Sequence, residues 1–376
     1  MFLTHLELTH YRSYAELHAD FSARKVILLG DNGQGKSNLL EAIGLLATGK
    51  SPIAQRDVEI VRWNAESAVI RADVSRELTA LHVDMLLRPH ARRAVRVNGT
   101  SLKRMADLFG RVLVVLFRSE DLQLVKGGPG DRREFLDTML IQISGTYYQR
   151  LRDYDRVLTQ RNHLLREVAA GQAASSQLDE WDEQLAVLAT GIWERRAQLA
   201  SRLVPRASSW YGRISDGKET LEMRYVPSVP SGSGPWIDEV RQALARVRAK
   251  EIARGATLVG PHRDDVELLL DGRPARAFGS QGQQRTIVLS LKLSELEVIE
   301  EATGEAPLLL LDDVLAELDV KRQNALLASI GDRIQTFVTS THLNDFSARW
   351  LDEADVYRVE AGQLRAVPRG GWEAPF

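Results

Sequence analysis

The residues best suited to chemistry lie in one glycine-rich segment, Gly30 to Ser37, which reads Gly-Asp-Asn-Gly-Gln-Gly-Lys-Ser. It matches the pattern GxxxxGK(S/T) of a phosphate-binding loop. Glycines let such a loop curl tightly, so that successive backbone N–H groups and the positive end of the following helix point at the β-phosphate of a nucleotide. Lys36 would reach the β- and γ-phosphates, and Ser37 would ligate Mg²⁺. The segment therefore predicts a nucleotide-binding site.

The flanks of this segment distinguish it from an ordinary glycine-rich turn. Residues 26–29 form an apolar run typical of a strand, and residues 38–43 read as a helix. This is the strand–loop–helix context that a phosphate-binding loop requires. The candidate nucleotide-binding residues in this part of the chain are Gly30, Asn32, Gly33, Gly35, Lys36, Ser37 and Asn38.

A second chemical segment consists of two adjacent acids. Residues 307–311 (Pro-Leu-Leu-Leu-Leu) predict a buried strand that ends in Asp312 and Asp313. We expect Asp312 to hold Mg²⁺ together with Ser37, and Asp313 to orient the attacking water. Because adjacent strand residues point to opposite faces, the two carboxylates are not expected to serve as equivalent metal ligands.

Two later segments complete the candidate site. The stretch Ser280-Gln-Gly-Gln-Gln-Arg285 directly precedes an expected helix from residue 286 to about residue 302, which Ser280 can cap. Gly282 lets another backbone approach closely, and a helix start favours an anion. His342 follows an apolar strand at residues 336–338. Taken alone, a histidine in that position is more commonly a surface residue.

Composition restricts the class of protein. With 376 residues, 44% of them hydrophobic, the chain can build a large core and two or three domains. The net charge of −2 limits any nucleic-acid surface to a local patch. The lack of cysteine excludes disulfides and thiolate metal sites and suits a reducing compartment. His5, Glu7 and His10 stand where a signal peptide needs an apolar core, and other apolar runs are shorter than a bilayer requires. We expect a cytoplasmic protein with no membrane partner.

The apolar spacing outside the helices predicts an α/β head with a flanking antiparallel sheet. Opening strands are expected within residues 3–13 and 21–29. Residues 67–75 and 80–87 alternate between apolar and polar side chains, which indicates antiparallel strands. The continuous apolar run at 111–117 is typical of a covered central strand.

An inserted α-helical arm separates the two halves of this head. Residues 131–169 and 177–216 show helical spacing, with a flexible turn at 171–176. Residues 227–235 form a linker, and 236–254 a further charged helix. We expect antiparallel helices.

The expected domains are therefore a head made of residues 1–128 and 256–376 and a helical arm domain, with a short coiled-coil-like hairpin, over residues 129–255. Three tryptophans lie in the long helical segments of the arm, namely Trp181, Trp193 and Trp210. We expect them to pack inside the arm, and the alternative is that they serve as base-stacking platforms.

A cationic hairpin is predicted between residues 88 and 104, where Asn98-Gly99 is a strong turn signal and no acidic residue occurs. Two interpretations stand. The hairpin contacts a nucleic-acid backbone, without sequence preference, or its charge protects a sheet edge from pairing with other chains. The candidate DNA-binding cations, which include two in the arm, are Arg88, Arg92, Arg93, Arg96, Lys103, Arg104, Arg132 and Arg133. For Arg133 the alternative is an ion pair inside the arm.

One further cluster has residue types that bind metals. It comprises His262, Asp264 and Asp265. Without a second histidine or a helical spacing, the metal interpretation is weak.

Taken in order, these motifs resemble the head of ABC-type ATPases. The order is the phosphate loop, the Ser-x-Gly-Gln helix start, the acid-ended strand, Glu317-Leu-Asp319 and Thr339-Ser-Thr-His342. The resemblance implies that ATP and Mg²⁺ are the cofactors and that two heads enclose two ATP molecules. The residues implied to complete the site of the other subunit are Ser280, Gly282 and Gln283. The implied catalytic residues are Lys36, Asp312, Asp313 and His342, the last corresponding to the switch histidine near the γ-phosphate.

Within that superfamily the chain resembles the RecF family of DNA-repair proteins over essentially its whole length. The segments that carry this resemblance are residues 124–129 through 132–137, 160–162, 260–265, and 311–313 through 316–319. Ser119 departs from the proline that is usual in the family. Asp313 stands where transporters carry glutamate, and its shorter side chain predicts slow hydrolysis with ATP acting mainly as a clamp.

The resemblance implies a mediator of recombinational repair. Such a protein is a homodimer in its ATP state, binds single-stranded and duplex DNA at gaps or junctions, has weak DNA-stimulated ATPase activity, and helps RecO and RecR to load RecA. The alternative is an SMC-like structural DNA-binding ATPase without a loading role. The long insertion before Ser280 argues against a transporter ATPase, and the lack of sustained heptads argues against an SMC-type arm.

Overall fold

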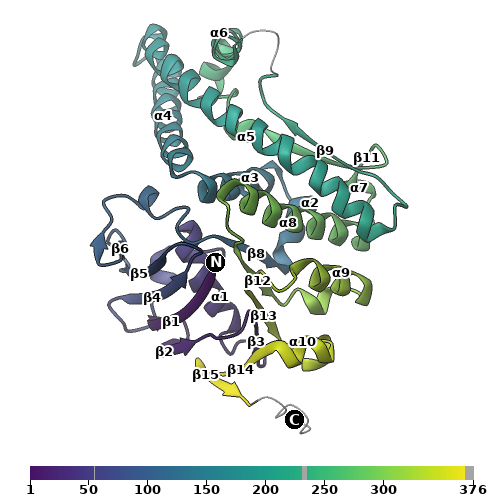
Figure 1. Ribbon diagram of the computed structural model, residues 1–376. Coiled ribbons are helices and arrows are strands. Elements are labelled where there is room, and N and C mark those ends of the chain that lie inside the picture. Colours follow the sequence, from purple (N-terminus) through teal and green to yellow (C-terminus); the bar gives the residue numbers. More distant parts are fainter. Residues whose placement is uncertain (55, 231–234, 369–376) are drawn as a thin grey trace. The chain divides into compact units, whose positions relative to one another are not determined.

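The computed structural model describes residues 1–54, 56–230 and 235–368 (Figure 1). Contacts divide the chain into two compact units, which we call the sheet unit (Met1–Asp121 with Leu291–Phe376) and the helical unit (Leu122–Ser290). This division differs from the expected boundaries, because residues 256–290 group with the helices. The strand at 265–270 pairs with another strand of the helical unit.

The sheet unit contains two six-stranded sheets. The first is antiparallel, and its strands in spatial order are β2 (Tyr14–Asp20), β1 (Phe2–Tyr11), β4 (Ala68–Ser75), β5 (Ala80–Leu87), β6 (Ala94–Val97) and β7 (Thr100–Ser101). The second is parallel except at one edge, in the order β15 (Gln363–Val367), β14 (Ala354–Glu360), β3 (Lys25–Leu29), β13 (Thr336–Ser340), β12 (Leu308–Asp312) and β8 (Val114–Arg118). The α/β head with a flanking antiparallel sheet is confirmed.

Burial along the strands explains this arrangement. Every residue of β3 and β13 is buried, as expected for strands covered on both faces. In β4 and β5 buried side chains alternate with more exposed ones, so one face of the first sheet is apolar and the other is polar. The strands expected at 67–75 and 80–87 are thus confirmed.

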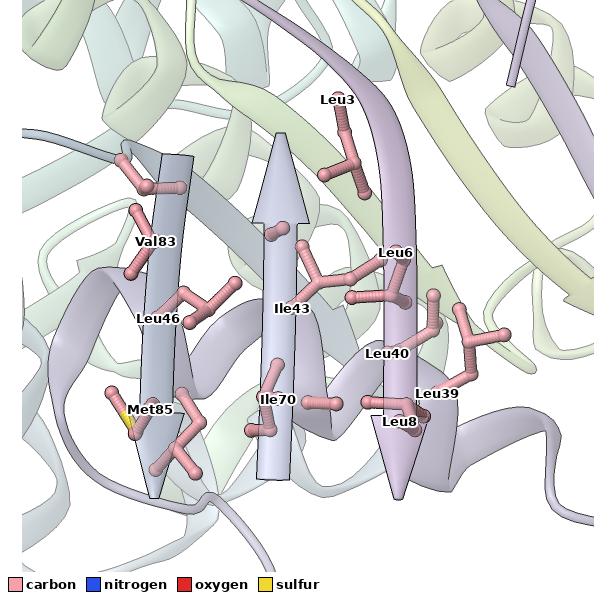
Figure 2. Close-up of a cluster of buried hydrophobic side chains, with 14 of the residues drawn as sticks. Leu3, Leu6, Leu8, Leu39, Leu40, Ile43, Leu46, Ile70, Val83 and Met85 are labelled. Atoms are coloured by element: carbon pink, nitrogen blue, oxygen red, sulfur yellow. The ribbon is translucent and has the colours of Figure 1, made fainter. Parts of the chain in front are cut away.

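Helix α1 (Lys36–Thr48) forms the centre of the sheet unit. Figure 2 shows Leu39, Leu40, Ile43 and Leu46 of α1 against the apolar face of the first sheet, among side chains of β1, β4 and β5. Residues of the second sheet, including Leu310, belong to the same buried cluster. The helix also contacts β8, β12 and β13. Apolar side chains therefore surround α1 on two sides, which fixes the position of its first residue.

The remaining helices of the sheet unit lie in its C-terminal part. They are α9 (Val320–Ile330) and α10 (Ala348–Glu353), together with the part of α8 (Gln281–Thr303) from Leu291 onward. Among the helices that the structure describes, none combines the length and apolarity needed to cross a membrane.

The helical unit is built on long helices and a small sheet. Its helices are α2 (Gln123–Lys126), α3 (Pro129–Ile143), α4 (Gly145–Ala169), α5 (Leu178–Ser215), α6 (Trp236–Arg254), α7 (Ala275–Phe278) and the start of α8. Its antiparallel sheet has the order β11 (Arg273–Pro274), β10 (Asp265–Leu270), β9 (Leu221–Val226). Of the linker expected at 227–235, residues 231–234 lie outside the described part of the chain.

Three local expectations need correction. The helical spacing at 131–169 covers two helices, because Ser144 has an extended backbone with φ −149° and ψ 107°. Helix α8 begins at Gln281 and not at residue 286, so Gly282 lies in its first turn. Strand β9 was not anticipated, since it pairs with β10, which lies far away in the sequence.

A buried arginine ties the helices of the helical unit together. Arg161 of α4 is fully buried and donates hydrogen bonds to Asp182 of α5 (2.6 Å), Glu251 of α6 (2.6 Å) and Thr257 (2.8 Å). Asn162 accepts from the backbone and hydroxyl of Thr257, both at 2.7 Å. The segment 160–162 thus has a structural role, because Arg161 neutralises the buried Glu251 and shares Asp182 with Arg248, which contacts it at 2.7 Å.

A second network surrounds Asp264, which is fully buried. Its carboxylate accepts hydrogen bonds from Arg196 (2.9 Å), Trp193 (2.8 Å) and Tyr225 (2.5 Å). His262 Nδ1 lies 2.5 Å from the Tyr154 hydroxyl, and burial lowers the pKa of His262 to about 4. The side chains of His262 and Asp264 are thus already hydrogen-bonded to other protein groups.

The tryptophans of the helical unit differ in exposure. Trp193 is fully buried, whereas Trp181 and Trp210 are partly buried. The guanidinium of Arg213 lies 3.9 Å from the centre of a Trp210 ring, a favourable cation–π contact. Of these three residues, Trp193 thus agrees best with the expectation that the tryptophans pack inside the arm.

Replacing Arg161 should destabilise the helical unit severely. In Arg161→Met, Glu251 loses its buried cationic partner, whereas Asp182 keeps its contact with Arg248. Breaking a buried pair such as that of Arg161 and Glu251 costs about 3–5 kcal/mol. Arg156→Met is the matched control on the same helix, because the Arg156 side chain is 77% exposed; we expect a change within about 0.5 kcal/mol. Urea unfolding followed by circular dichroism measures both, and equal losses in the two variants would contradict the structural role of Arg161.

Candidate functional site

The candidate site lies at one edge of the second sheet. Strands β3, β13 and β12 are parallel neighbours, so their carboxyl ends meet at the same edge. The phosphate loop follows β3, His342 follows β13, and Asp313 follows β12. Ligands of open α/β sheets bind outside the carboxyl ends of the strands. Residues far apart in the sequence are therefore brought to one place.

The phosphate loop has the backbone that its glycines predict. Gly33 and Gly35 have φ values of 80° and 116°, in the region that side chains other than glycine rarely adopt. Helix α1 has no side-chain cap, which leaves its first N–H groups available to an anion. Lys36 is 4% exposed, and its Nζ donates to the carbonyl oxygens of Gly30 (2.6 Å) and Asp31 (3.0 Å). The ammonium group thus lies within the loop.

Neighbouring segments brace the loop from two sides. The Tyr14 hydroxyl donates to the carbonyl oxygen of Gly35 at 2.9 Å. Across the loop, Gln34 accepts hydrogen bonds from the backbone of Ala361 (2.7 Å, to Oε1) and Gly362 (3.1 Å, to the carbonyl). A Cβ atom on Gly30 would lie 2.4 Å from the carbonyl oxygen of Val359, so glycine is required there for packing.

The two acids converge on one hydroxyl group. Ser37 Oγ donates to Asp312 Oδ1 at 2.8 Å. The Oγ1 of Thr339 lies 3.0 Å from Asp312 Oδ1 and 3.3 Å from Asp313 Oδ1, and it accepts from the Asp313 backbone N–H at 2.8 Å. The expectation that the acids point to opposite faces was wrong. Strand β12 ends at Asp312, and Asp313 has a left-handed backbone with φ 53°, so strand alternation does not apply to it.

Burial controls the ionisation of Asp312. Desolvation raises its pKa above the ordinary value of 3.8, and the hydrogen bonds from Ser37 and Thr339 oppose this effect. The negative charge of Asp313 raises the pKa further. A carboxylate in this environment is destabilised when it is ionised without a cation, which favours binding of a positive ion beside it.

The remaining candidates in the sheet unit have simpler surroundings. His342 is exposed, and its backbone N–H donates to Ser340 Oγ at 3.1 Å. Asn32 is also exposed. The Asn38 amide donates to Ser13 Oγ at 3.1 Å, so in this structure its side chain supports the turn between β1 and β2.

The Ser-x-Gly-Gln segment belongs to the helical unit. Ser280 is exposed and forms a reciprocal cap with Gln283: the Ser280 N–H donates to Gln283 Oε1 (2.6 Å), and the Gln283 N–H donates to Ser280 Oγ (3.3 Å). The cap that the sequence predicted for Ser280 is confirmed. Gln283 Nε2 also donates to Glu219 (2.5 Å), and nearby Phe278 is 67% exposed. This helix start thus presents a polar cap beside an exposed aromatic ring.

The predicted cationic hairpin is present at the β7 edge of the first sheet. Asn98 and Gly99 form its turn with φ values of 49° and 77°. The hairpin cations with exposed side chains and no ion pair among the described residues are Arg88, Arg92, Arg96 and Lys103. The position at an edge is consistent with both interpretations of the charge.

Four of the eight candidate cations are bound to other groups. Arg93 contacts the Asp57 carboxylate, and Arg104 pairs with Asp107 at 2.9 Å. Arg132 is buried against Asp265 at 2.7 Å. Arg133 donates to the backbone oxygen of Asp264 at 2.7 Å, so its partner lies inside the helical unit. These contacts make Arg93 and Arg132 poor candidates for binding DNA, because each would have to leave a carboxylate.

Several supporting residues were missed. Arg12 makes a two-pronged contact with Glu41 of α1 (2.7 and 2.8 Å), and Glu41 is 1% exposed. A single acid inside an apolar helix was a usable signal, since a buried carboxylate needs a cation. Thr339 and Tyr14 had no comparable signal, because their partners are set by tertiary packing.

The fold and the site define an ABC-type ATPase head. The family profile "RecF/RecN/SMC N terminal domain" matches residues 2–363. A solved SMC head bound to the C-winged helix domain of ScpA has a TM-score of 0.55 at 16% identity, covering 98% of each chain, which is a likeness of fold.

Closer relatives specify the family. The chain is 50% identical over 375 residues to the DNA replication and repair protein RecF of Synechococcus sp. (strain JA-3-3Ab), covering 98% of both chains. It is 47% identical to that of Gloeobacter violaceus, covering 98% of this chain and 99% of the relative. A solved "recombination mediator protein RecF-ATP in RecFOR pathway" has a TM-score of 0.89 at 31% identity, covering 97% of each chain. The chain belongs to the RecF family.

Replacing Asp312 with asparagine should stabilise the nucleotide-free chain. Asparagine keeps an oxygen acceptor for Ser37 and Thr339 but carries no charge. Below the ordinary pKa of aspartate, the folded and unfolded forms are both protonated; the cost of ionising the folded form appears as the pH rises and is complete above the raised pKa. We therefore expect Asp312→Asn to raise the Tm at pH 7, with a smaller difference at pH 4.

Calorimetric scans at the two pH values measure this effect. Asp352→Asn is the control, because Asp352 is exposed, and the Tm of this variant should match that of the parent protein at both pH values. A Tm below that of the parent at pH 7 in Asp312→Asn would show that the charge of Asp312 stabilises the fold.

Proposed function

We propose that this chain is an ATP-binding recombination mediator that acts in DNA replication and repair. The observation that carries the proposal is the contact of Ser37 with Asp312 at 2.8 Å beside the buried Lys36, because these groups are the ones that an ATP–Mg²⁺ site needs. The family supports it, since relatives named for DNA replication and repair match along the whole chain.

The oxygen atoms at the carboxyl edge of the second sheet are suitable ligands for Mg²⁺. The ion prefers oxygen ligands and retains several waters, so Ser37, Asp312 and phosphate oxygens form an adequate set. When bound, Mg²⁺ neutralises phosphate charge. Lys36 and the first N–H groups of α1 bind the phosphates, and Thr339 keeps Asp312 and Asp313 in place through its hydroxyl group.

Hydrolysis is proposed to be slow and stimulated by DNA. Asp313 orients the attacking water, and His342 lies near the γ-phosphate. Because the Asp313 side chain is short and close to Thr339, it holds the water less well than a glutamate would. ATP then serves mainly as a switch.

The ATP state is proposed to be a homodimer. Ser280, Gly282 and Gln283 of one chain complete the site of the other, which suits the exposed helix start of α8. Nucleotide that binds only between two chains shifts the association equilibrium by mass action. This closed pair binds DNA at gaps or junctions and acts with RecO and RecR in loading RecA.

Dimerisation tests this proposal. Ser280→Arg places a bulky cation at the helix start, so we expect the monomer to bind ATP within about twofold of the parent affinity and to remain monomeric with Mg²⁺ and a non-hydrolysable ATP analogue. Ser201→Arg is the matched control, because Ser201 is exposed in the same unit, and it should dimerise normally. Analytical ultracentrifugation decides the question, and a dimer of Ser280→Arg would exclude the composite site.

The hairpin cations give a separate prediction for DNA binding. If Arg96 contacts a phosphate, Arg96→Ala lowers the slope of log K against log salt concentration by about 0.9 for duplex DNA. Arg365→Ala removes an exposed cation from β15 and should leave the slope unchanged. Fluorescence anisotropy over a salt series measures both. An unchanged slope together with new aggregation of Arg96→Ala would instead support edge protection.

A further inference from the structure

The outer face of the first sheet carries a group of histidines and acids that the nucleotide site does not use. Leu6 and Leu8 of β1 point toward α1 (Figure 2). Since strand residues alternate, His5 and Glu7 face the opposite side. The register pairs Glu7 with His18 of β2, so the side chains of His5, Glu7 and His18 meet on this face.

The geometry points to a binding site for a divalent transition metal such as Zn²⁺, and we propose that His5, Glu7 and His18 are its ligands. One ligand atom from each of the three residues lies within 4.8 Å of the others. Two imidazoles and a carboxylate form a common zinc ligand set, which leaves a fourth position for water. Mg²⁺ is disfavoured because it prefers oxygen ligands.

Both histidines are already oriented by carboxylates. His5 Nδ1 lies 2.7 Å from Asp20 Oδ1, and His18 Nε2 lies 3.0 Å from Glu16 Oε1. In each ring this occupies one nitrogen and leaves the other for a metal. Histidines that bind metals commonly use their second nitrogen in this way, which fixes the tautomer and ring direction. The free nitrogen of His18, Nδ1, is the one that faces Glu7 Oε2, at 4.0 Å.

The local charge also suits a divalent cation. Glu7 uses its other oxygen, Oε1, for Arg71 at 2.5 Å. With the histidines neutral, the carboxylates of Glu7, Glu16 and Asp20 and the guanidinium of Arg71 leave two net negative charges. His5 and His18 are 29% and 54% exposed, so small rotations can bring the ligand atoms to bonding distance without repacking the core.

A metal at this site would join β1 to β2. These strands lead into the turn that contains Ser13 and precedes Tyr14, and both residues contact the region of the phosphate loop. Binding to the folded state alone stabilises that state in proportion to the logarithm of metal concentration. A bound metal therefore cross-links β1 and β2 and stabilises the strand pair whose turn contacts the phosphate loop.

Zinc titration of the full chain, freed of any affinity tag and kept in excess Mg²⁺ without nucleotide, tests the proposal. Calorimetry should show one equivalent of Zn²⁺ per chain. His5→Ala and His18→Ala should each weaken binding at least about tenfold, and Asp20→Asn about 10–100-fold through the orientation of His5. Imidazole NMR signals of His5 and His18 should shift with the same titration.

His82→Ala is the matched control, because His82 lies on β5 and contacts Asp73 at 2.6 Å in a similar polar setting. It should bind Zn²⁺ as the parent does. Absence of binding by the parent, equal binding by His18→Ala, or loss of binding only in His82→Ala would each overturn the proposal. Circular dichroism in chelator confirms that every variant is folded, so a lost signal reports the metal site.

Discussion

The sheet unit depends on the burial of α1 between two sheets. Leu39, Leu40 and Ile43 have almost no contact with solvent, and the same cluster includes side chains from both sheets. Burial of each such side chain contributes about 1.5–3 kcal/mol. Because the first residue of α1 is Lys36, the packing that stabilises the unit also determines where the phosphate loop ends and where its N–H groups point.

Polar contacts further fix the positions of the elements that apolar packing has brought together. Arg12 contacts Glu41 on α1, and Tyr14 contacts the phosphate loop itself. The turn between β1 and β2 therefore fixes the position of the loop relative to α1. In the helical unit, Arg161 and Arg196 also hold packed segments in place. Each is buried, and each joins segments that are distant in the sequence. Such buried charges are a poor source of net stability, but they penalise alternative packings in which a carboxylate would be unpaired.

Local signals made much of this structure predictable. The phosphate loop, the strands β4 and β5, the Asn98-Gly99 turn and the Ser280 cap follow from residues that are neighbours in the sequence. The break at Ser144 and the pairing of β9 with β10 do not, because serine tolerates helix and extended backbone alike and because strand pairing over long distances has no local signature. Arg93 and Arg132 show the same limit for charges, since a cation's partner is chosen by the fold.

The left-handed backbone at Asp313 restricts which side chains fit at this position without strain. Aspartate and asparagine tolerate a positive φ better than other side chains of their size, because a short polar group can bond to the nearby backbone. A glutamate in the same conformation would have a longer chain to accommodate and would lose the short approach to Thr339. Exchange of this acid for glutamate is thus expected to cost stability unless the backbone after β12 changes with it.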